Sequence, residues 1–218
     1  MDYFMLVNLV SGFLILSALA VVLAPTPKAS TYFYILQALL IVGLFIALGA
    51  ATDSETLLKW SITSFVTKVV LVPAMFLFAL KKLAAYKKPP AEGKTKPLLM
   101  IGLAAIEVLV CYVLVDGINL PMVAEVKLPL AISLAHFFIG LTCIITQRNI
   151  FKQVFGYCLM ENGSHITLAL LASTAPELVE IGVATDAIFA VLIMLAVASM
   201  IYKVNKTVDA HDLSELRG

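Results

Sequence analysis

The chain has 218 residues, of which 61% are hydrophobic and 13% charged, and its formal net charge is +1. A water-solvated domain of this length needs far more polar residues to cover its surface, so the composition excludes an ordinary soluble protein. The near-neutral charge gives no sign of nucleic-acid binding, and no nucleic acid is expected among the partners. With a mean hydropathy of +1.02, the chain is predicted to lie in a lipid bilayer.

Long apolar segments divide the chain into about seven predicted transmembrane helices, because a helix needs ~20 apolar residues to cross the hydrocarbon core. They are expected at residues 4–24, 32–51, 57–80, 98–115, 128–146, 150–172 and 178–202. Turn-forming residues such as Pro25, Pro27 and Pro176 separate them. Strand-like alternation is absent from the sequence, so the predicted fold class is an all-α, polytopic integral membrane protein.

A basic linker divides the chain into two predicted membrane segments. Residues 1–80 form an N-terminal three-helix segment, 81–97 the linker, 98–203 a C-terminal four-helix segment, and 204–218 a polar tail. The linker lysines are Lys81, Lys82, Lys87, Lys88, Lys94 and Lys96. Cytoplasmic loops carry an excess of Lys and Arg, so the linker, the connection with Arg148 and Lys152, and the tail are all expected in the cytoplasm.

An odd number of spans then places the N-terminus outside and the C-terminus in the cytoplasm, in a multi-pass protein of the cytoplasmic (inner) membrane. The loops on the outer side, 52–56 and 173–180, carry no basic residue. The first span lacks a basic region followed by a small-residue cleavage site, so it is interpreted as a retained anchor.

Ionisable residues lie near the middle of several spans, where a helix passes the membrane midplane. A charge at this depth costs roughly 2.5–3.5 kcal/mol on insertion scales, so such residues are typical of proton or ion handling. The candidate residues of a proton or ion path are Lys68, Glu107, His136, Glu161, His165 and Asp186.

Lys68 continues a stripe with Ser61 and Ser64, and Pro73 follows five residues later, where it should kink the helix. Lys68 is either half of a structural ion pair or a lysine whose charge changes as a proton passes. Glu107 stands nearly alone on its helix. It must therefore be protonated or meet a partner from another helix.

His136 shares a face with small residues such as Ser133 and Gly140, which suits either helix packing or a proton relay. Glu161 and His165 are four residues apart, so they share a helix face and can exchange a proton directly or through water. Glu177 and Glu180 begin the last span, where the positive end of the helix dipole favours acidic side chains, and capping is the interpretation for both.

The chain carries no sequence motif for a cofactor of its own. Cys111, Cys143 and Cys158 all fall inside predicted spans without Cys-x-x-Cys spacing, so they are read as small buried residues. No phosphate-binding loop, dinucleotide fingerprint or nucleophile elbow is present. No cofactor or metal is expected in this chain, and no catalytic activity is expected from it alone.

From about residue 131 to 218 the chain resembles the K subunit of bacterial complex I and the C subunit of multisubunit cation/proton antiporters. The resemblance rests on Arg148-Asn149, Gly156, Asn162, the 184–187 segment Ala-Thr-Asp-Ala and the terminal 214–218 segment Ser-Glu-Leu-Arg-Gly. Aligned without gaps, the first membrane glutamate of the family falls on Cys158, and Glu161 lies three residues later on much the same face. Asp186 takes the place of the second.

Over its whole length the chain is similar to hydrogenase-4 component E, with matching stretches at 60–68, 155–165 and 176–186. The resemblance implies a membrane-arm subunit of a hydrogenase-4 or formate hydrogenlyase-type oxidoreductase complex. Its partners would be antiporter-like and quinone-module-like membrane subunits and peripheral hydrogenase subunits. A nickel–iron centre and iron–sulfur clusters would belong to those partner subunits.

Three functional hypotheses follow. In the first, the midplane residues form part of a proton or sodium path coupled to electron transfer in the partner subunits. In the second, the same path serves a multisubunit cation/proton antiporter without redox chemistry. In the third, the chain is a structural membrane adaptor whose paired charges are silent. The coupling ion, its direction and the electron donor and acceptor are not set by the sequence.

Overall fold

The computed structural model describes residues 3–84, 97–118 and 126–213. The helices are α1 (Tyr3–Leu23), α2 (Pro27–Thr52), α3 (Glu55–Ser64), the π-helix η1 (Phe65–Leu71), α4 (Val72–Ala84), α5 (Pro97–Asp116), α6 (Lys127–Thr146), α7 (Ile150–Leu171), α8 (Glu177–Asn205) and the short α9 (Ala210–Leu213). The predicted linker lysines Lys87, Lys88, Lys94 and Lys96 and the terminal motif 214–218 lie outside the described residues.

Six helical segments of the described chain are long and apolar enough to cross a membrane, with α3, η1 and α4 forming one of them (Glu55–Leu83). This confirms the predicted all-α, polytopic membrane protein. The predicted span 150–172 corresponds to α7, which is 22 residues long but lies outside this set. Its polar side chains, including Lys152, Asn162 and His165, are buried among other helices, so this helix does not need an apolar surface for lipid.

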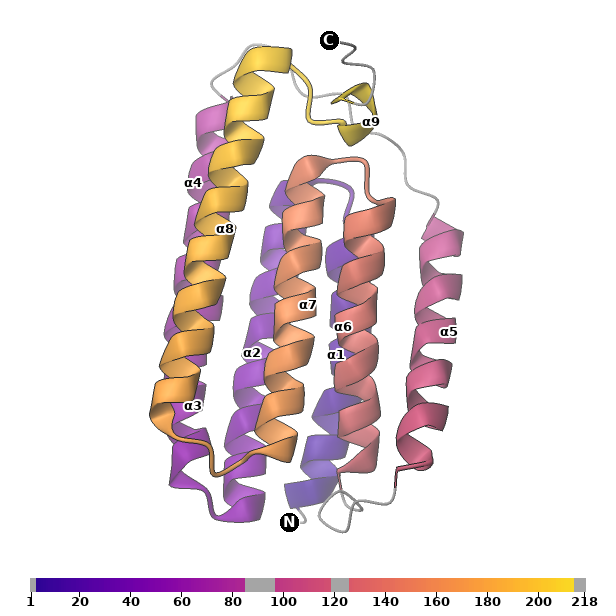
Figure 1. The fold of residues 1–218 in the computed structure, drawn as a ribbon, viewed down its shortest axis with the longest axis vertical. Helices are drawn as coiled ribbons and strands as arrows, with labels where there is room; N and C mark the ends of the chain where they lie inside the picture. Colours follow the sequence, from indigo (N-terminus) through magenta and orange to yellow (C-terminus); the bar gives the residue numbers. More distant parts are fainter. Residues whose placement is uncertain (1–2, 85–96, 119–125, 214–218) are drawn as a thin grey trace.

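The long helices run side by side in two layers (Figure 1). The front layer consists of α8, α7, α6 and α5, and the rear layer of the α3–η1–α4 span, α2 and α1. The α6–α7 pair is the most closely packed, while α5 lies at one edge of the bundle. The start of α1 and the end of α8 lie at opposite ends of the bundle (Figure 1).

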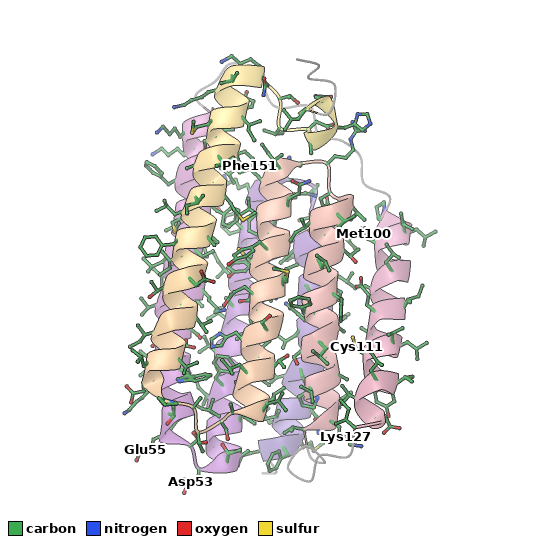
Figure 2. The ribbon with its side chains drawn as sticks, viewed as in Figure 1. Asp53, Glu55, Met100, Cys111, Lys127 and Phe151 are labelled. Atoms are coloured by element: carbon green, nitrogen blue, oxygen red, sulfur yellow. The ribbon has the colours of Figure 1, made fainter. Side chains whose placement is uncertain are left out.

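Side-chain caps define where several helices begin. Thr26 accepts a hydrogen bond from the Ala29 amide at 3.2 Å, and Pro27 occupies the first helical position of α2, where its missing N–H costs nothing. Asn149 caps α7 in the same way through the Phe151 amide at 2.9 Å. The two capped turns, α1–α2 and α6–α7, lie at the same end of the bundle as α9 (Figure 1). Asp53, Glu55 and Lys127 lie at the opposite end (Figure 2).

The segment after α8, around Asp209, is bound to the α6–α7 turn. The Arg148 guanidinium binds the Asp209 carboxylate in bidentate fashion, with N–O distances of 3.0 and 2.8 Å. Two backbone hydrogen bonds, from Ile150 to Val208 and from Ala210 to Arg148, close an isolated bridge beside this pair. Bidentate arginine–carboxylate geometry adds specificity to the attraction, so the chain after α8 has a defined position over α6 and α7.

Glycines let the backbones of α6 and α7 come into contact. A Cβ atom on Gly140 would lie 2.3 Å from the Met160 amide nitrogen, and one on Gly163 would lie 2.5 Å from the amide nitrogen of Phe137. A Cβ atom on Gly156 would likewise lie 2.8 Å from the Gly140 carbonyl oxygen. All three obstacles include rigid backbone atoms, so any side chain here must push the two helices apart.

We expect Gly140→Ala and Gly163→Ala each to lower the melting temperature of the detergent-purified chain. Separating two packed helices costs about 1–3 kcal/mol, more than the gain of up to ~1 kcal/mol from alanine's helix propensity. Gly102→Ala and Gly182→Ala are matched controls, because a Cβ there meets no atom within 4 Å. Equal melting temperatures for all four variants would contradict the close α6–α7 packing.

Candidate functional site

A layer of polar side chains crosses the bundle between two apolar clusters. Toward the α9 end, one cluster includes Phe76 and Phe155; toward the other end, the second includes Phe45 and Trp60. The polar layer consists of the buried or half-buried residues Gln37, Ser64, Lys68, His136, Glu161, Asn162 and His165. On each of α2, α6 and α7, the polar residues lie between residues of the first apolar cluster and residues of the second.

A pair of opposite charges lies at the centre of this polar layer. The Lys68 ammonium is 2.6 and 2.8 Å from the two carboxylate oxygens of Glu161, and 2.7 Å from Oδ1 of Asn162. The Lys68 side chain is 2% exposed and that of Glu161 12% exposed. The ammonium therefore directs its donors to three oxygen atoms from α7. The structure thus pairs Lys68 with Glu161 and leaves Glu161 slightly more open than its partner.

The helix around Lys68 is wound as a π-helix, η1. The Val72 amide donates to the Thr67 carbonyl, five residues earlier. Pro73 follows immediately and has no amide hydrogen to donate, so it cannot continue the ordinary α-helical ladder. A π-turn shifts the side chains that follow it around the helix axis and is frequent at functional positions. The sequence predicted a kink at Pro73, and the structure has the π-helix directly before it, ending two residues earlier at Leu71.

Glu161 also borders a hollow between α7 and α8. The hollow has a volume of about 350 Å³, and its polar lining residues are Tyr157, Glu161, Ser164, His165 and Asp186. It is polar and roomy enough for several water molecules. Asp186, the predicted equivalent of a second membrane carboxylate, is exposed on α8 and lines this hollow rather than pairing with Lys68. Glu161 thus has the buried cation on one side and a space that can hold water on the other.

A second buried carboxylate contacts His165. Glu180 is 1% exposed, its carboxylate contacts Nε2 of His165, and its other oxygen accepts a hydrogen bond from Ser64 Oγ at 3.1 Å. The imidazole lies against the Phe45 and Trp60 rings, with centroid distances of 4.8 and 5.6 Å. The capping interpretation of Glu180 is therefore wrong, because the side chain turns into the bundle, whereas Glu177 stays at the surface and pairs with Lys59.

His136 forms the other end of the polar layer. It is fully buried on α6, and its Nε2 contacts the side-chain amide of Gln37 on α2. The small residues on the same helix face, Ser133, Gly140 and Cys143, are buried as well, so this face also serves close packing.

Glu107 is not brought to the polar layer. It is half-buried on α5 and contacts the hydroxyl of Thr142 on α6. The sequence left two alternatives for Glu107, a protonated carboxyl or a partner from another helix. The structure gives it a neutral hydroxyl from another helix, and among the described residues it forms no ion pair. It therefore lies at the α5–α6 edge of the bundle, apart from the other five candidate residues.

Sequence reasoning missed three members of the site: Gln37, Asn162 as a Lys68 ligand, and Glu180. Gln37 and Asn162 could have been found by the depth criterion that found Lys68, since each is a polar amide near the middle of an apolar span. Glu180 could not, because its position in the first turn of α8 suits a surface cap equally well. Only the packing of α8 against α3 shows that it is buried.

The described residues contain no group of three or more His, Cys, Asp or Glu side chains arranged to hold a metal ion. The three cysteines are buried and form no disulfide with one another. What the site can do chemically is hold and exchange protons: it offers two carboxylates, an ammonium and two imidazoles within or beside one buried layer.

Fold and site together define a polytopic α-helical membrane protein with a buried layer of polar and ionisable side chains. A family model, NADH-ubiquinone/plastoquinone oxidoreductase chain 4L, matches residues 128–218. The chain is 45% identical over 214 residues to hydrogenase-4 component E of Escherichia coli K12, an alignment that covers 98% of each chain. The same values hold for hydrogenase-4 component E of Escherichia coli O157:H7 and of Shigella flexneri. No solved structure matches the chain.

The chain belongs to the hydrogenase-4 component E family. This confirms the resemblance over the whole length, and the chain 4L match confirms the relation of the C-terminal part to a complex I subunit. The 4L match begins at α6, so it includes Glu161, His165 and Asp186 but not Lys68, which comes from the preceding helices.

The Lys68–Glu161 pair is testable by a double-mutant cycle on thermal unfolding in detergent. Lys68→Met leaves the Glu161 charge buried without its cation, and breaking such a pair typically costs about 3–5 kcal/mol. Adding Glu161→Gln removes the orphaned charge and should restore most of the lost melting temperature. Additive effects of the two substitutions would show that the two side chains do not interact. Lys59→Met with Glu177→Gln, a surface pair, is the control and should show little coupling.

Proposed function

We propose that this chain is a membrane-arm subunit of a hydrogenase-4 or formate hydrogenlyase-type complex, and that its polar layer is part of a proton path coupled to electron transfer in partner subunits. The observation that carries the proposal is the central pair: Glu161 is held by a buried lysine and also borders a polar hollow. Family membership supports the assignment to this type of complex.

The path begins at the hollow between α7 and α8. Water in the hollow connects Asp186 with Glu161, which can take up a proton from that side. Protonation removes the negative charge that holds Lys68, and in a medium of low dielectric this loss is large compared with thermal energy. Lys68, then buried without its anion, releases a proton more readily, because burial disfavours an unpaired charge. This sequence gives Lys68 the second role considered for it, a lysine whose charge state follows proton passage.

His165 and Glu180 form a branch of the same path. His165 borders the hollow that holds Glu161 and Asp186, and it contacts Glu180, which is closed off from solvent. An imidazole that contacts a carboxylate can receive a proton on one nitrogen and release it from the other. Glu107 is assigned to a separate position at the α5–α6 edge, where an adjoining membrane subunit would continue a path.

We assign the end of the bundle with α9 to the cytoplasm. Lys81, Lys82, Lys203 and Lys206 lie at this end, as do Arg148 and Lys152 near the α6–α7 turn. The opposite end, with the N-terminus, Asp53 and Ser173, is assigned to the outside of the cytoplasmic membrane. The division into residues 1–80, the 81–97 linker, 98–203 (complex I K-subunit-like from about 131) and the 204–218 tail remains a proposal about sequence units.

Cysteine labelling of intact cells tests this topology. A membrane-impermeant maleimide should react with Asp53→Cys or Ser173→Cys and should miss Lys206→Cys and Lys87→Cys until the membrane is opened. The native cysteines give little background because all three are buried. Labelling of Lys206→Cys from outside would invert the assignment.

The complex assignment is tested by purification. The isolated chain should show neither hydrogenase nor formate dehydrogenase activity, and a gentle detergent extraction should recover it with peripheral subunits that contain nickel and iron–sulfur clusters. The measurement is metal analysis of the purified assembly. A stable assembly of antiporter subunits without nickel or iron would favour the cation/proton antiporter instead.

The proton path is tested with amide substitutions that keep side-chain shape. Asp186→Asn and Glu180→Gln should leave assembly intact, whereas Glu161→Gln leaves Lys68 without its anion and should also lower the melting temperature. Proton uptake by inside-out vesicles, normalised to assembled complex, should fall roughly 100-fold or more for Glu161→Gln, as for a positioned proton-transfer group. His165→Ala should act in the same direction but more weakly, since water can replace a relay imidazole.

The matched control for this measurement is Glu177→Gln, which removes a surface carboxylate from the same first turn of α8 as Glu180. It should leave coupling unchanged. Wild-type coupling in the Glu161→Gln, Asp186→Asn double variant would contradict the proton path. It would favour the structural adaptor, in which the paired charges take no part in proton transfer.

A further inference from the structure

We propose that the groove between α4 and α8 binds one anionic phospholipid, with its phosphate between Lys82 and Lys203 and an acyl chain along the apolar groove wall. The groove lies at the α9 end of the bundle, where these two helices run parallel (Figure 1), and its volume is about 370 Å³. This site is separate from the polar layer and does not depend on the proposed proton path.

The groove exists because small residues line its floor. Ala79 on α4 and Ala196 and Ser199 on α8 leave a channel, whose sides are formed by larger apolar side chains such as Phe78 and Met200. Phe78 is 69% exposed and Met200 65% exposed. The channel is therefore open toward the lipid side of the bundle, and its shape and apolar surface suit a hydrocarbon chain.

The charge at the end of the groove is positive. Lys82 and Lys203 line it from opposite helices, each in the last turn, and Lys81 is adjacent. Two helix C-termini carry together about one negative charge. Three lysines therefore more than offset the two dipoles, and none of the residues lining the groove is acidic. The excess positive charge attracts an anion.

The depth of these lysines matches a lipid headgroup. On the α3–η1–α4 span, no charged residue occurs between Lys68 and Lys81, and on α8 none occurs between Asp186 and Lys203. Both helices thus become charged at the same boundary, where the apolar stretch ends and the headgroup region begins. A free inorganic anion would contact the lysines but leave the apolar channel unused, whereas a phospholipid satisfies both.

The experiment is native mass spectrometry of the full-length chain in detergent, delipidated and then titrated with phosphatidylglycerol or phosphatidylcholine of identical acyl chains. Phosphatidylglycerol should be retained more strongly. Each lysine near a headgroup contributes roughly a fivefold gain in affinity, so Lys82→Gln with Lys203→Gln should weaken phosphatidylglycerol retention about 25-fold. Lys59→Gln with Lys127→Gln removes the same charge at the opposite end of the bundle and is the control, expected to have no effect.

A second variant tests the channel itself. Ala196→Phe fills the groove from an exposed position, keeps both lysines and should lower retention of both lipids. Unchanged retention in the double lysine variant, equal retention of the two lipids by the wild type, or full displacement by millimolar inorganic phosphate would each overturn the proposal. So would an assembled complex that retains no phosphatidylglycerol at this groove because a partner helix occupies it.

Discussion

The removal of Lys68 and Glu161 from water is the constraint on which the rest of the bundle depends. Transferring either charge alone into an apolar interior costs several kcal/mol, so the pair is tolerable only with close geometry and further hydrogen-bond partners. Asn162 supplies the third oxygen for the ammonium, and it is adjacent to Glu161 on the same helix. One helix must therefore present two polar side chains to one cation.

Several local features follow from that requirement. The π-turn of η1 carries Lys68 just before Pro73, and the glycine contacts of α6 with α7 bring α7 into the middle of the bundle. Because α7 is enclosed, it can carry Lys152, Asn162 and His165 on buried faces, and its composition is too polar to mark it as a membrane span. Apolar clusters above and below then isolate the polar layer from both membrane surfaces.

The part of the chain that matches the chain 4L family does not contain the whole polar layer. The chain 4L match covers residues 128–218, whereas the cation that holds Glu161 and the amide that contacts His136 come from helices before that region. The N-terminal helices are therefore part of the site and not only an added anchor. The 98% coverage of hydrogenase-4 component E agrees with this, since the relatives contain both parts.

The sequence by itself determined the helical elements. Span length and hydropathy are local properties, so boundaries such as 128–146 agree with α6 (Lys127–Thr146) almost to the residue. The tertiary structure alone decided the partners: Lys68 with Glu161, His165 with Glu180, His136 with Gln37, and the separation of Glu107 from all of them. Spacing along one helix assigns a residue to a face of that helix, but which side chain meets it depends on how the helices pack against one another. For that reason Glu180, which lies 116 residues after Ser64 in the sequence but accepts a hydrogen bond from it, could be recognised only in the folded bundle.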